Sequence, residues 1–254
     1  MIARIFACLM MMSCAVMAQD IVVLGEVHDN PAHHQVQAAE VATLKPAALV
    51  FEMLTPDQAD GAVLDVAAGA EALNATLAWA DSGWPDFAMY YPIFAAAAEA
   101  RVYGAGVPRD VAMQAMQTGI ADLFGDDAAA YGLAKPLPEA EQTARNALQM
   151  AAHCDALPAE MLPAMVEIQR LRDATLARTA LRALQETGGP VAVITGNGHA
   201  RPDWGVPAYL ARVAPDVTVR AVGQTESGAP LEGGFAEVVS ADAPDRADPC
   251  EAFR

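Results

Sequence analysis

Short apolar runs with little polar interruption recur along the chain. They lie at 20–25, 47–52, 101–107, 190–196 and 217–223, and a sixth candidate lies at 235–240. Continuous rather than alternating apolar character is typical of strands that are covered on both faces, as in a parallel sheet. The pattern therefore predicts strands in the middle layer of a layered domain.

Helical patterns fill the gaps between these runs. Residues 31–44 are predicted to form a helix with Asn30 as N-cap and Pro31 at the first helical position. A second helix is expected at 204–213, before the fifth run. Strand, helix and strand in alternation predict an α/β fold with a mostly parallel sheet of about five or six strands and flanking helices.

Two longer alanine-rich segments, at about 55–99 and 112–187, are predicted to be mainly helical. They are expected to be insertions that form a helical cap subdomain over the edge of the sheet. No internal repeat is visible, so residues 19–241 are interpreted as a single domain. Residues 242–254 are expected to be an acidic tail, poorly ordered at 242–249.

The first eighteen residues have the parts of a secretory signal peptide. One positive charge at Arg4 precedes an apolar run that ends near the small residue Ala18. A buried first helix or an uncleaved anchor is the alternative, and the residues before Cys14 make a poor lipidation site, which disfavours a lipid anchor. No later stretch approaches membrane-spanning length. We expect a periplasmic or secreted protein without a membrane span.

Charge and cysteine usage narrow the classes of partner. The formal net charge of −17 disfavours nucleic acid, because an acidic surface repels phosphate backbones. Cys154 and Cys250 remain after removal of the leader; they can pair in an oxidising compartment or remain two free thiols. The sequence contains no Cys-x-x-Cys-His motif, which excludes covalent attachment of c-type haem.

Charged and imidazole side chains follow three of the predicted strands. Loops beyond the carboxyl ends of parallel strands lie together in an open α/β sheet, so these side chains are expected to converge. Tight turns alone would explain the neighbouring glycines but not the polar groups. By default, His33 and His34 are interpreted as surface or locally bonded residues, and His153 as a surface or core residue. The core polar set is Glu26, His28, Glu52 and His199.

Six motifs in order carry a resemblance to a known family. They are LGEVHDNPAHHQ (24–35), FEM (51–53), GWPDFAMYYPIF (83–94), VPRD (107–110), QRLRDATLA (169–177) and GNGHARPDWGVPAYL (196–210). Together they resemble the ChaN-like family, whose members are described as iron-regulated, haem-binding and usually secreted or lipid-anchored. The resemblance runs from about residue 21 to residue 223.

The resemblance implies an α/β domain with a helical subdomain that binds haem non-covalently, with two haems stacked across a homodimer. It extends distantly to proteins similar to erythromycin esterases and Tiki-type metalloproteases. In the esterases the first glutamate and histidine are three residues apart, whereas Glu26 and His28 are two apart. Leu176 stands where the family often has methionine.

Haem binding, in iron or haem uptake or handling, is the first functional hypothesis. Haem needs an apolar slot, one or two axial donors and cations for its propionates. The aromatic segment that includes Trp84 offers a wall, although the same residues would also suit the core of a helical cap. The candidate axial donors are Tyr90, Tyr91 and His199, and the candidate propionate partners are Arg109, Arg172 and Arg201.

A hydrolase is the alternative hypothesis. Glu26, His28, Glu52 and His199 supply nitrogen and oxygen donors for one zinc or manganese ion, or a metal-free general acid and base pair. A third reading is a domain that binds a small molecule, or acts as a scaffold, with a decayed site. The sequence leaves open whether any reaction is catalysed.

Overall fold

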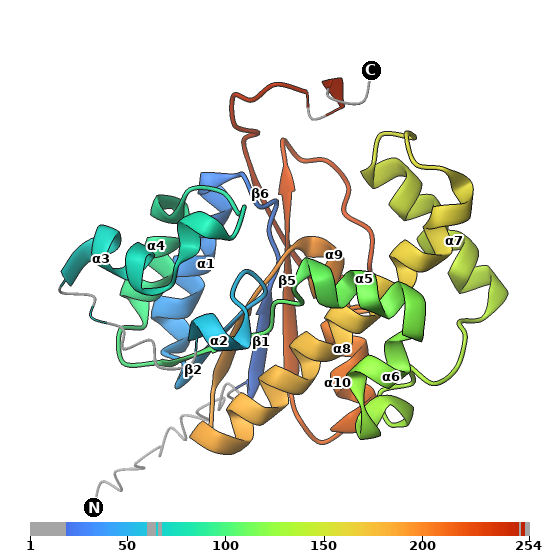
Figure 1. Cartoon of the computed structure of the whole chain (residues 1–254). Coiled ribbons are helices and arrows are strands. Elements are labelled where there is room, and N and C mark those ends of the chain that lie inside the picture. The colour runs from blue at the N-terminus through green and yellow to red at the C-terminus, as the bar shows by residue number, and fades with distance from the viewer. Residues whose placement is uncertain (1–18, 60–64, 66–67, 249, 252–254) are drawn as a thin grey trace, which may run out of the picture.

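The computed structural model describes residues 19–59, 65, 68–248 and 250–251. Its centre is one six-stranded sheet in the order β3-β2-β4-β1-β5-β6 (Figure 1). All five strand pairings are parallel. The predicted signal peptide lies outside the described residues. The strands are β1 (Ile21–Leu24), β2 (Ala48–Phe51), β3 (Arg101–Gly104), β4 (Val191–Ile194), β5 (Val219–Glu226) and β6 (Glu237–Ala241).

The three strands that the site depends on are neighbours in this sheet. Every residue of β1, β2 and β4 is buried, which is why their sequences are apolar without alternation. The registers align their ends, since Leu24 and Phe51 both lie opposite Ile194. The loops after β1, β2 and β4 therefore start at the same level of the sheet.

Helix α1 begins as the sequence predicted. It spans Pro31–Leu44, and the Asn30 side chain accepts a hydrogen bond from the backbone N–H of Ala32 at 3.0 Å. This cap fixes where the loop after β1 becomes helical. The remaining α-helices are α2 (Pro56–Ala59), α3 (Gly69–Thr76), α4 (Phe87–Ala96), α5 (Arg109–Thr118), α6 (Ile120–Phe124), α7 (Glu139–Ala152), α8 (Leu162–Thr187), α9 (Asn197–Ala200) and α10 (Val206–Val213).

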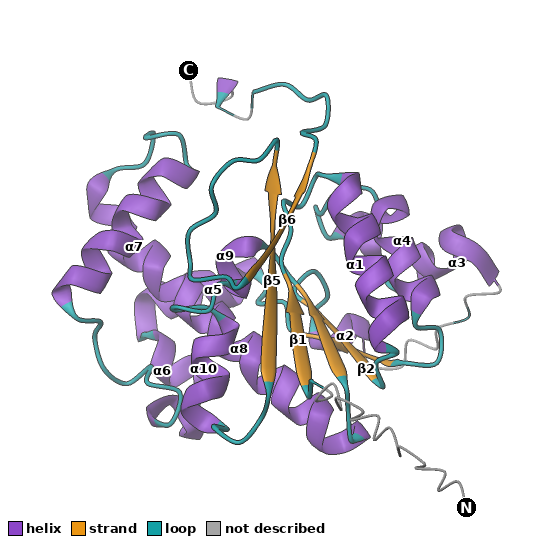
Figure 2. Cartoon of the chain, turned by 180° about the vertical axis from the view of Figure 1, so that it is seen from behind, coloured by secondary structure: helices purple, strands orange, loops and turns teal. Residues whose placement is uncertain are grey.

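Helices cover both faces of the sheet. Figure 2 shows α1, α3 and α4 on one side and α6, α8 and α10 on the other. The first layer packs around Phe51 and Phe94, whose rings stack at 4.4 Å, and the second packs around Leu171 and Leu176. The α/β fold with a parallel sheet and flanking helices is confirmed.

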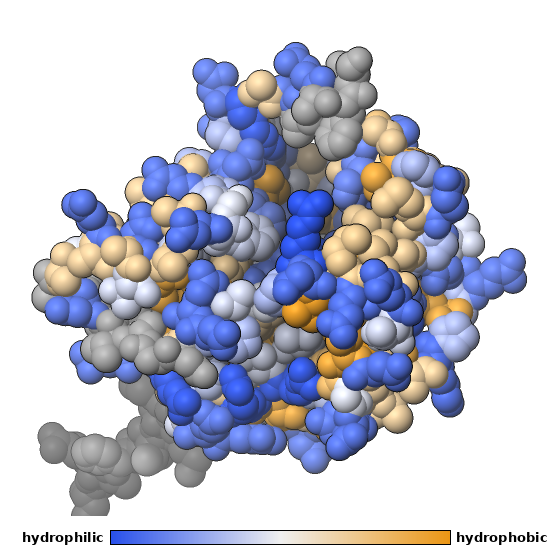
Figure 3. Space-filling view, viewed as in Figure 1, coloured by the Kyte–Doolittle hydropathy of each residue, from blue (hydrophilic) through white to orange (hydrophobic). Residues whose placement is uncertain are grey.

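The two alanine-rich segments go to opposite faces. Helices α2 to α4 come from the first segment, and α5 to α8 come from the second. The long helix α8 contacts β2, β3 and β4, and α7 packs on α8. Within the described part of the chain, no helix is long and apolar enough to cross a membrane. On the face shown in Figure 3, hydrophilic side chains are spread throughout, in keeping with the excess of acidic residues.

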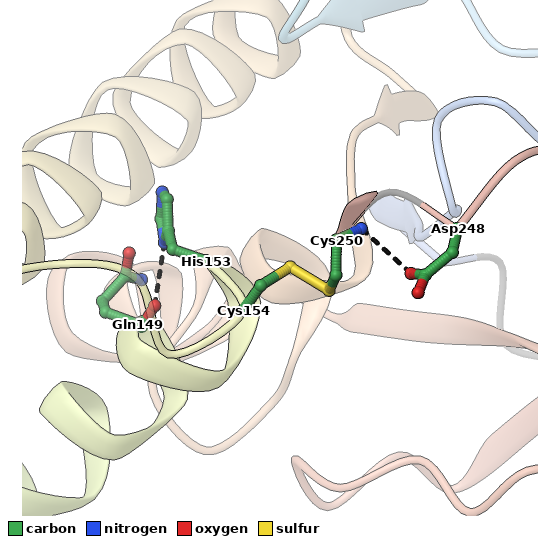
Figure 4. Close-up of a disulfide and its surroundings, with 5 residues drawn as sticks. All are labelled: Gln149, His153, Cys154, Asp248 and Cys250. Atoms are coloured by element: carbon green, nitrogen blue, oxygen red, sulfur yellow. Dashed lines mark hydrogen bonds between the residues drawn. A yellow bond between two sulfur atoms is a disulfide. The ribbon is translucent and has the colours of Figure 1, made fainter. Parts of the chain in front are cut away.

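The segment after β6 is linked to the rest of the domain by ion pairs and a disulfide, and the weak order expected at 242–249 stays a prediction. Arg246 forms ion pairs with Asp29 at 3.0 Å and with Glu226 at 2.6 Å. A disulfide joins Cys154, just after α7, to Cys250 (Figure 4). Charge pairing and one covalent bond therefore hold a segment that has few apolar side chains of its own.

Opening this disulfide should lower the free energy of unfolding. Cys154 and Cys250 are 96 residues apart in the sequence, and closing a loop of that size stabilises the folded state by roughly 4.7 kcal/mol. We expect Cys250→Ser to lose most of this amount in urea unfolding. Added reductant should destabilise the wild-type protein and leave the Cys154→Ser/Cys250→Ser double variant unchanged, whereas an equal response of both would contradict the pairing.

Candidate functional site

Three adjacent strand ends supply the polar groups of the site. Glu26 follows β1, Glu52 follows β2, and Gly196 and His199 follow β4. Because β2, β4 and β1 are neighbours in the sheet, side chains that lie far apart in sequence come together at its carboxyl edge. The predicted convergence of the core polar set is what the geometry shows.

Glu26 is a buried carboxylate surrounded by donors. It is 2 % exposed, and its Oε1 accepts hydrogen bonds from His28 Nδ1 and from the Tyr90 hydroxyl, both at 2.7 Å. His34 Nε2 lies 3.4 Å from Oε2, within ion-pair distance but without hydrogen-bond geometry. The site therefore includes one imidazole from the loop after β1 and one from α1.

This environment keeps Glu26 ionised. Burial raises the pKa of its carboxyl, but the interactions with His28 and His34 outweigh burial and lower the pKa to about 2. Burial and the neighbouring carboxylate raise the pKa of Tyr90 well above its usual range, so the phenol keeps its proton. Burial opposes protonation of His28, yet the hydrogen bond to Glu26 and the charge of Glu52 raise its pKa.

A second buried network runs through His199. Its Nδ1 lies 2.6 Å from Asp173 Oδ1, and its Nε2 lies 3.5 Å from Glu52 Oε1. Glu52 Oε2 accepts hydrogen bonds from the Thr195 hydroxyl at 2.6 Å and from the Gly196 backbone N–H at 2.9 Å. The imidazole of His199 thus lies between two carboxylates.

The two neighbouring carboxylates explain why the His199 imidazole is protonated. Burial lowers the pKa of His199, but the charges of Glu52 and Asp173 outweigh it and raise the pKa to about 8. Burial raises the pKa of Asp173, while His199 and His28 hold the pKa of Glu52 below its ordinary value in spite of burial. His199 is therefore mainly an imidazolium at neutral pH.

The two networks meet at Gly196. A Cβ placed on this glycine would lie 2.9 Å from His28 Nε2, so only glycine lets the imidazole lie against the loop after β4. The other side of the His28 ring faces the Trp84 indole, with ring centroids 4.8 Å apart. His28 is thereby held between the loop after β4 and the aromatic segment.

Two cavities open beside these networks. The first has a volume of about 550 Å³ and lies between the loops after β1 and β4 and the helices α7 and α8. Its lining includes His28, His153 and His199 together with the apolar side chains of Leu148, Val166 and Trp204. The second cavity is smaller, about 260 Å³, and Glu52 belongs to its lining.

The residues predicted to contact haem do not gather at one cavity. Trp84, Arg109 and Arg172 line the second cavity, whereas His199 lines the first. Tyr91 is half-buried against the core layer that contains α4. Helix α8 contributes to both cavities, through Asp173 to the first and through Arg172 to the second.

Two other predicted contacts are engaged within the protein. The Tyr90 side chain is fully buried, and its hydroxyl donates to Glu26. Arg201 is 6 % exposed, pairs with both carboxylate oxygens of Asp203 at 2.7 Å, and lies over the Trp204 ring at 3.5 Å. Their ligand roles remain predictions.

The predicted metal ligands form pairs rather than one cluster. Among the residues that the structure describes, no group of three or more histidine, cysteine, aspartate and glutamate side chains is arranged to hold a metal ion. Glu26 bonds to His28, whereas Glu52 faces His199. The roles of these four side chains as zinc or manganese ligands therefore also remain predictions.

Sequence reasoning missed Asp173 and the local roles of Tyr90, His34 and His153. Asp173 had a visible signal, because it shares one face of α8 with the buried residues Leu176, Ala177 and Ala180. A single acid on an apolar helical stripe needs a buried partner. His153 lines the first cavity, and nothing near it in the sequence indicated this.

A family model described as "Haem-binding uptake, Tiki superfamily, ChaN" matches residues 12–210. The chain belongs to this family. Among solved structures, the chain is similar to ChaN of Campylobacter jejuni, which has cofacial haem binding, with 19 % identity, a TM-score of 0.66 and 87 % of each chain covered. This similarity shows the shared fold.

A weaker match is the type III effector HopBA1, with 13 % identity and a TM-score of 0.47, covering 89 % of this chain and 88 % of the effector. A search of curated proteins found no match. Membership of the ChaN family supports haem as the class of ligand, and the polar groups of the site lie at the carboxyl edge of the sheet.

The proton on His199 should make stability depend on pH. Its pKa is about 8 in the folded protein, against an ordinary value of 6.5, so it stabilises the fold fully below about pH 6.5. This contribution, on the order of 2 kcal/mol, is lost as the pH rises through about 8. In urea unfolding at several pH values, the difference in the free energy of unfolding between the wild-type protein and His199→Gln should shrink as the pH rises through about 8.

The matched control for this measurement is His33→Gln. Burial lowers the pKa of His33, so removal of this histidine should leave the loss of stability above neutral pH in place. The same pH dependence in the wild-type protein and in His199→Gln would contradict a proton held on His199 by Glu52 and Asp173.

Proposed function

We propose that this chain is an exported protein that binds haem non-covalently, in the uptake or handling of haem or iron. Membership of a haem-binding family supports the ligand class. The observation that carries the proposal is the first cavity, whose lining combines apolar side chains with three histidines, His28, His153 and His199. The leader predicted at residues 1–18 and the disulfide suit an oxidising compartment.

The size and the lining of the first cavity support the binding of a porphyrin. Its volume of about 550 Å³ falls within the usual range of small-molecule sites, roughly 300–1,000 Å³. Leu148, Val166 and Trp204 offer apolar contacts, and histidines offer nitrogen donors. Haem brings its own iron chemistry, so the chain has to bind it, orient it and limit the access of water.

The state of the two cysteines supports non-covalent rather than covalent binding of haem. Cys154 and Cys250 are joined to each other, and no Cys-x-x-Cys-His motif is present in the sequence. A homodimer, which the resemblance implied, stays a prediction that sedimentation with and without haem would test.

Filling the first cavity should weaken haem binding. Ala152 is exposed at the end of α7 and lines the cavity, so Ala152→Trp would occupy it without disturbing the core. We expect hemin affinity, measured from the Soret band during titration, to fall at least tenfold, roughly 1.4 kcal/mol. Ala151→Trp is the matched control, because Ala151 is also exposed but is not part of the lining.

The titration distinguishes two failures. If hemin produces no shifted Soret band with the wild-type protein, haem binding is rejected. If the wild-type protein binds hemin and both tryptophan variants bind it equally well, the ligand binds outside the first cavity.

The network around His199 favours hydrolysis as a second candidate function. Asp173 orients the imidazole through Nδ1, and Glu52 lies 3.5 Å from Nε2. A charged imidazole could donate a proton while the adjacent carboxylate accepts one from water, which requires no metal. The arrangement is that of a general acid beside a general base.

Loss of the orienting carboxylate tests this candidate. If an ester or peptide library reveals turnover, Asp173→Asn should lower kcat on the order of 100-fold with the fold intact. Asp203→Asn is the control, since Asp203 pairs with Arg201 outside this network. Absence of turnover by the wild-type protein across the library would remove hydrolysis as a function.

A further inference from the structure

A third cavity, with a volume of about 320 Å³, lies between the loop at 131–138, the loop before α10 and the helices α7, α8 and α10. Helices α7 and α10 both pack on α8 (Figure 1). The cavity shares Arg145 and Trp204 with the lining of the first cavity, but it contains none of the core polar set. Its chemistry therefore differs from that of the strand ends.

Positive side chains predominate in this cavity, although the chain as a whole is acidic. The formal net charge is −17, so most of the surface repels anions. The lining nevertheless has more cationic than acidic side chains. These are Lys135, Arg145, Arg170 and Arg212, against Glu141 and Asp203. Such a local excess of positive charge favours an anionic ligand.

Both acidic side chains of this lining are already paired. Glu141 accepts hydrogen bonds from Arg145 at 3.0 and 2.5 Å. Asp203 accepts one hydrogen bond through each oxygen, both at 2.7 Å, from Arg201, which lies outside the lining. These two carboxylates therefore leave the other cations of the lining without a counter-charge from the cavity itself.

Two guanidinium groups from different helices contact Gly132. Arg170 of α8 is 3 % exposed and donates to the carbonyl oxygens of Gly132 at 2.8 Å and Lys135 at 2.9 Å. It also pairs with Glu167 at 2.7 Å, yet its buried Nε has no acceptor among the described residues. A Cβ placed on Gly132 would lie 3.1 Å from Cζ of Arg212 on α10. Like charges on one residue repel, and a nearby anion would relieve that repulsion.

Lys135 and Arg212 are the cations available to a ligand. Both are exposed, and neither forms an ion pair within the part of the chain that the structure describes. Their backbones are held in place, since the Lys135 carbonyl bonds to Arg170 and Arg212 belongs to α10. A guanidinium matches the paired oxygens of a carboxylate or phosphate, and an ammonium adds a compact positive charge.

The rest of the lining suits the carbon skeleton of a small molecule. Pro136, Leu137 and Pro138 form one continuous stretch of it, and Trp204 adds an aromatic ring. The volume of about 320 Å³ lies near the lower end of the usual range for small-molecule sites, roughly 300–1,000 Å³. The size therefore favours a small organic compound.

We propose that the third cavity binds a small organic anion with at least two negative charges on carboxylate or phosphate groups. Lys135 and Arg212 contact these groups, and the fixed guanidinium of Arg170 adds positive charge beside them. The proposal does not rest on haem, so this site and the proposed haem function can each hold without the other.

The test is isothermal titration calorimetry of the full wild-type chain without haem, with citrate as the carboxylate probe and glycerol phosphate as the phosphate probe. Added sodium chloride should weaken the binding, because the contacts are charged. Lys135→Glu and Arg212→Glu should each lower the affinity at least roughly tenfold, the scale of one hydrogen bond to a charged group. Lys45→Glu is the matched control, since Lys45 is exposed after α1 and lies outside the lining.

A second pair of variants distinguishes the cavity from the general effect of charge. Ala208 is half-buried on α10 and belongs to the lining, so Ala208→Trp would fill the cavity without a change of charge. Ala211 is exposed on the same helix and lies outside the lining. We expect Ala208→Trp to lose the binding and Ala211→Trp to keep it.

The outcomes decide both the site and the class of anion. Binding of citrate alone identifies carboxylate groups, and binding of glycerol phosphate alone identifies phosphate groups. If neither probe binds to the wild-type protein, or if Lys135→Glu, Arg212→Glu and Ala208→Trp all bind as tightly as it does, the proposal is wrong. A wild-type circular dichroism spectrum of each variant excludes misfolding as the cause of a loss.

Discussion

Two carboxylates buried at the end of a parallel sheet are the constraint on which this site depends. Glu26 and Glu52 are 2 % and 8 % exposed. An ionised carboxylate far from water is costly unless positive charge and hydrogen-bond donors surround it. The imidazoles of His28 and His199 lie beside these carboxylates, while Tyr90, Thr195 and the Gly196 backbone donate hydrogen bonds to them.

This constraint explains much of the local sequence. His28 needs glycine at position 196, because any larger residue would displace its ring. His199 needs an acid on its second nitrogen, and Asp173 supplies it from the middle of α8. The polar site thus connects three strand ends to α8. The protonation of His199 therefore depends on how α8 packs against the sheet.

Most of the fold and part of the site could be predicted from the sequence. The strands and α1 were predictable because two-sided burial demands apolar runs and because Asn30 and Pro31 mark the start of the helix. The placement of the core polar set at the carboxyl edge of the sheet could be predicted from the order of strands and helices alone. The position of Asp173 on an apolar helical face indicates a buried acid but not its partner, and no pattern marks His153, because both roles depend on the rotation of α7 and α8 against the sheet.

The segment after β6 bears on how the first cavity behaves when it fills. Its Arg246 forms an ion pair with Asp29 in the loop after β1, and its Cys250 is covalently joined to Cys154 at the end of α7. These are the two sides between which the cavity opens. To widen the cavity, these two sides would have to move apart, which would break the ion pair between Arg246 and Asp29 or strain the bond between Cys154 and Cys250.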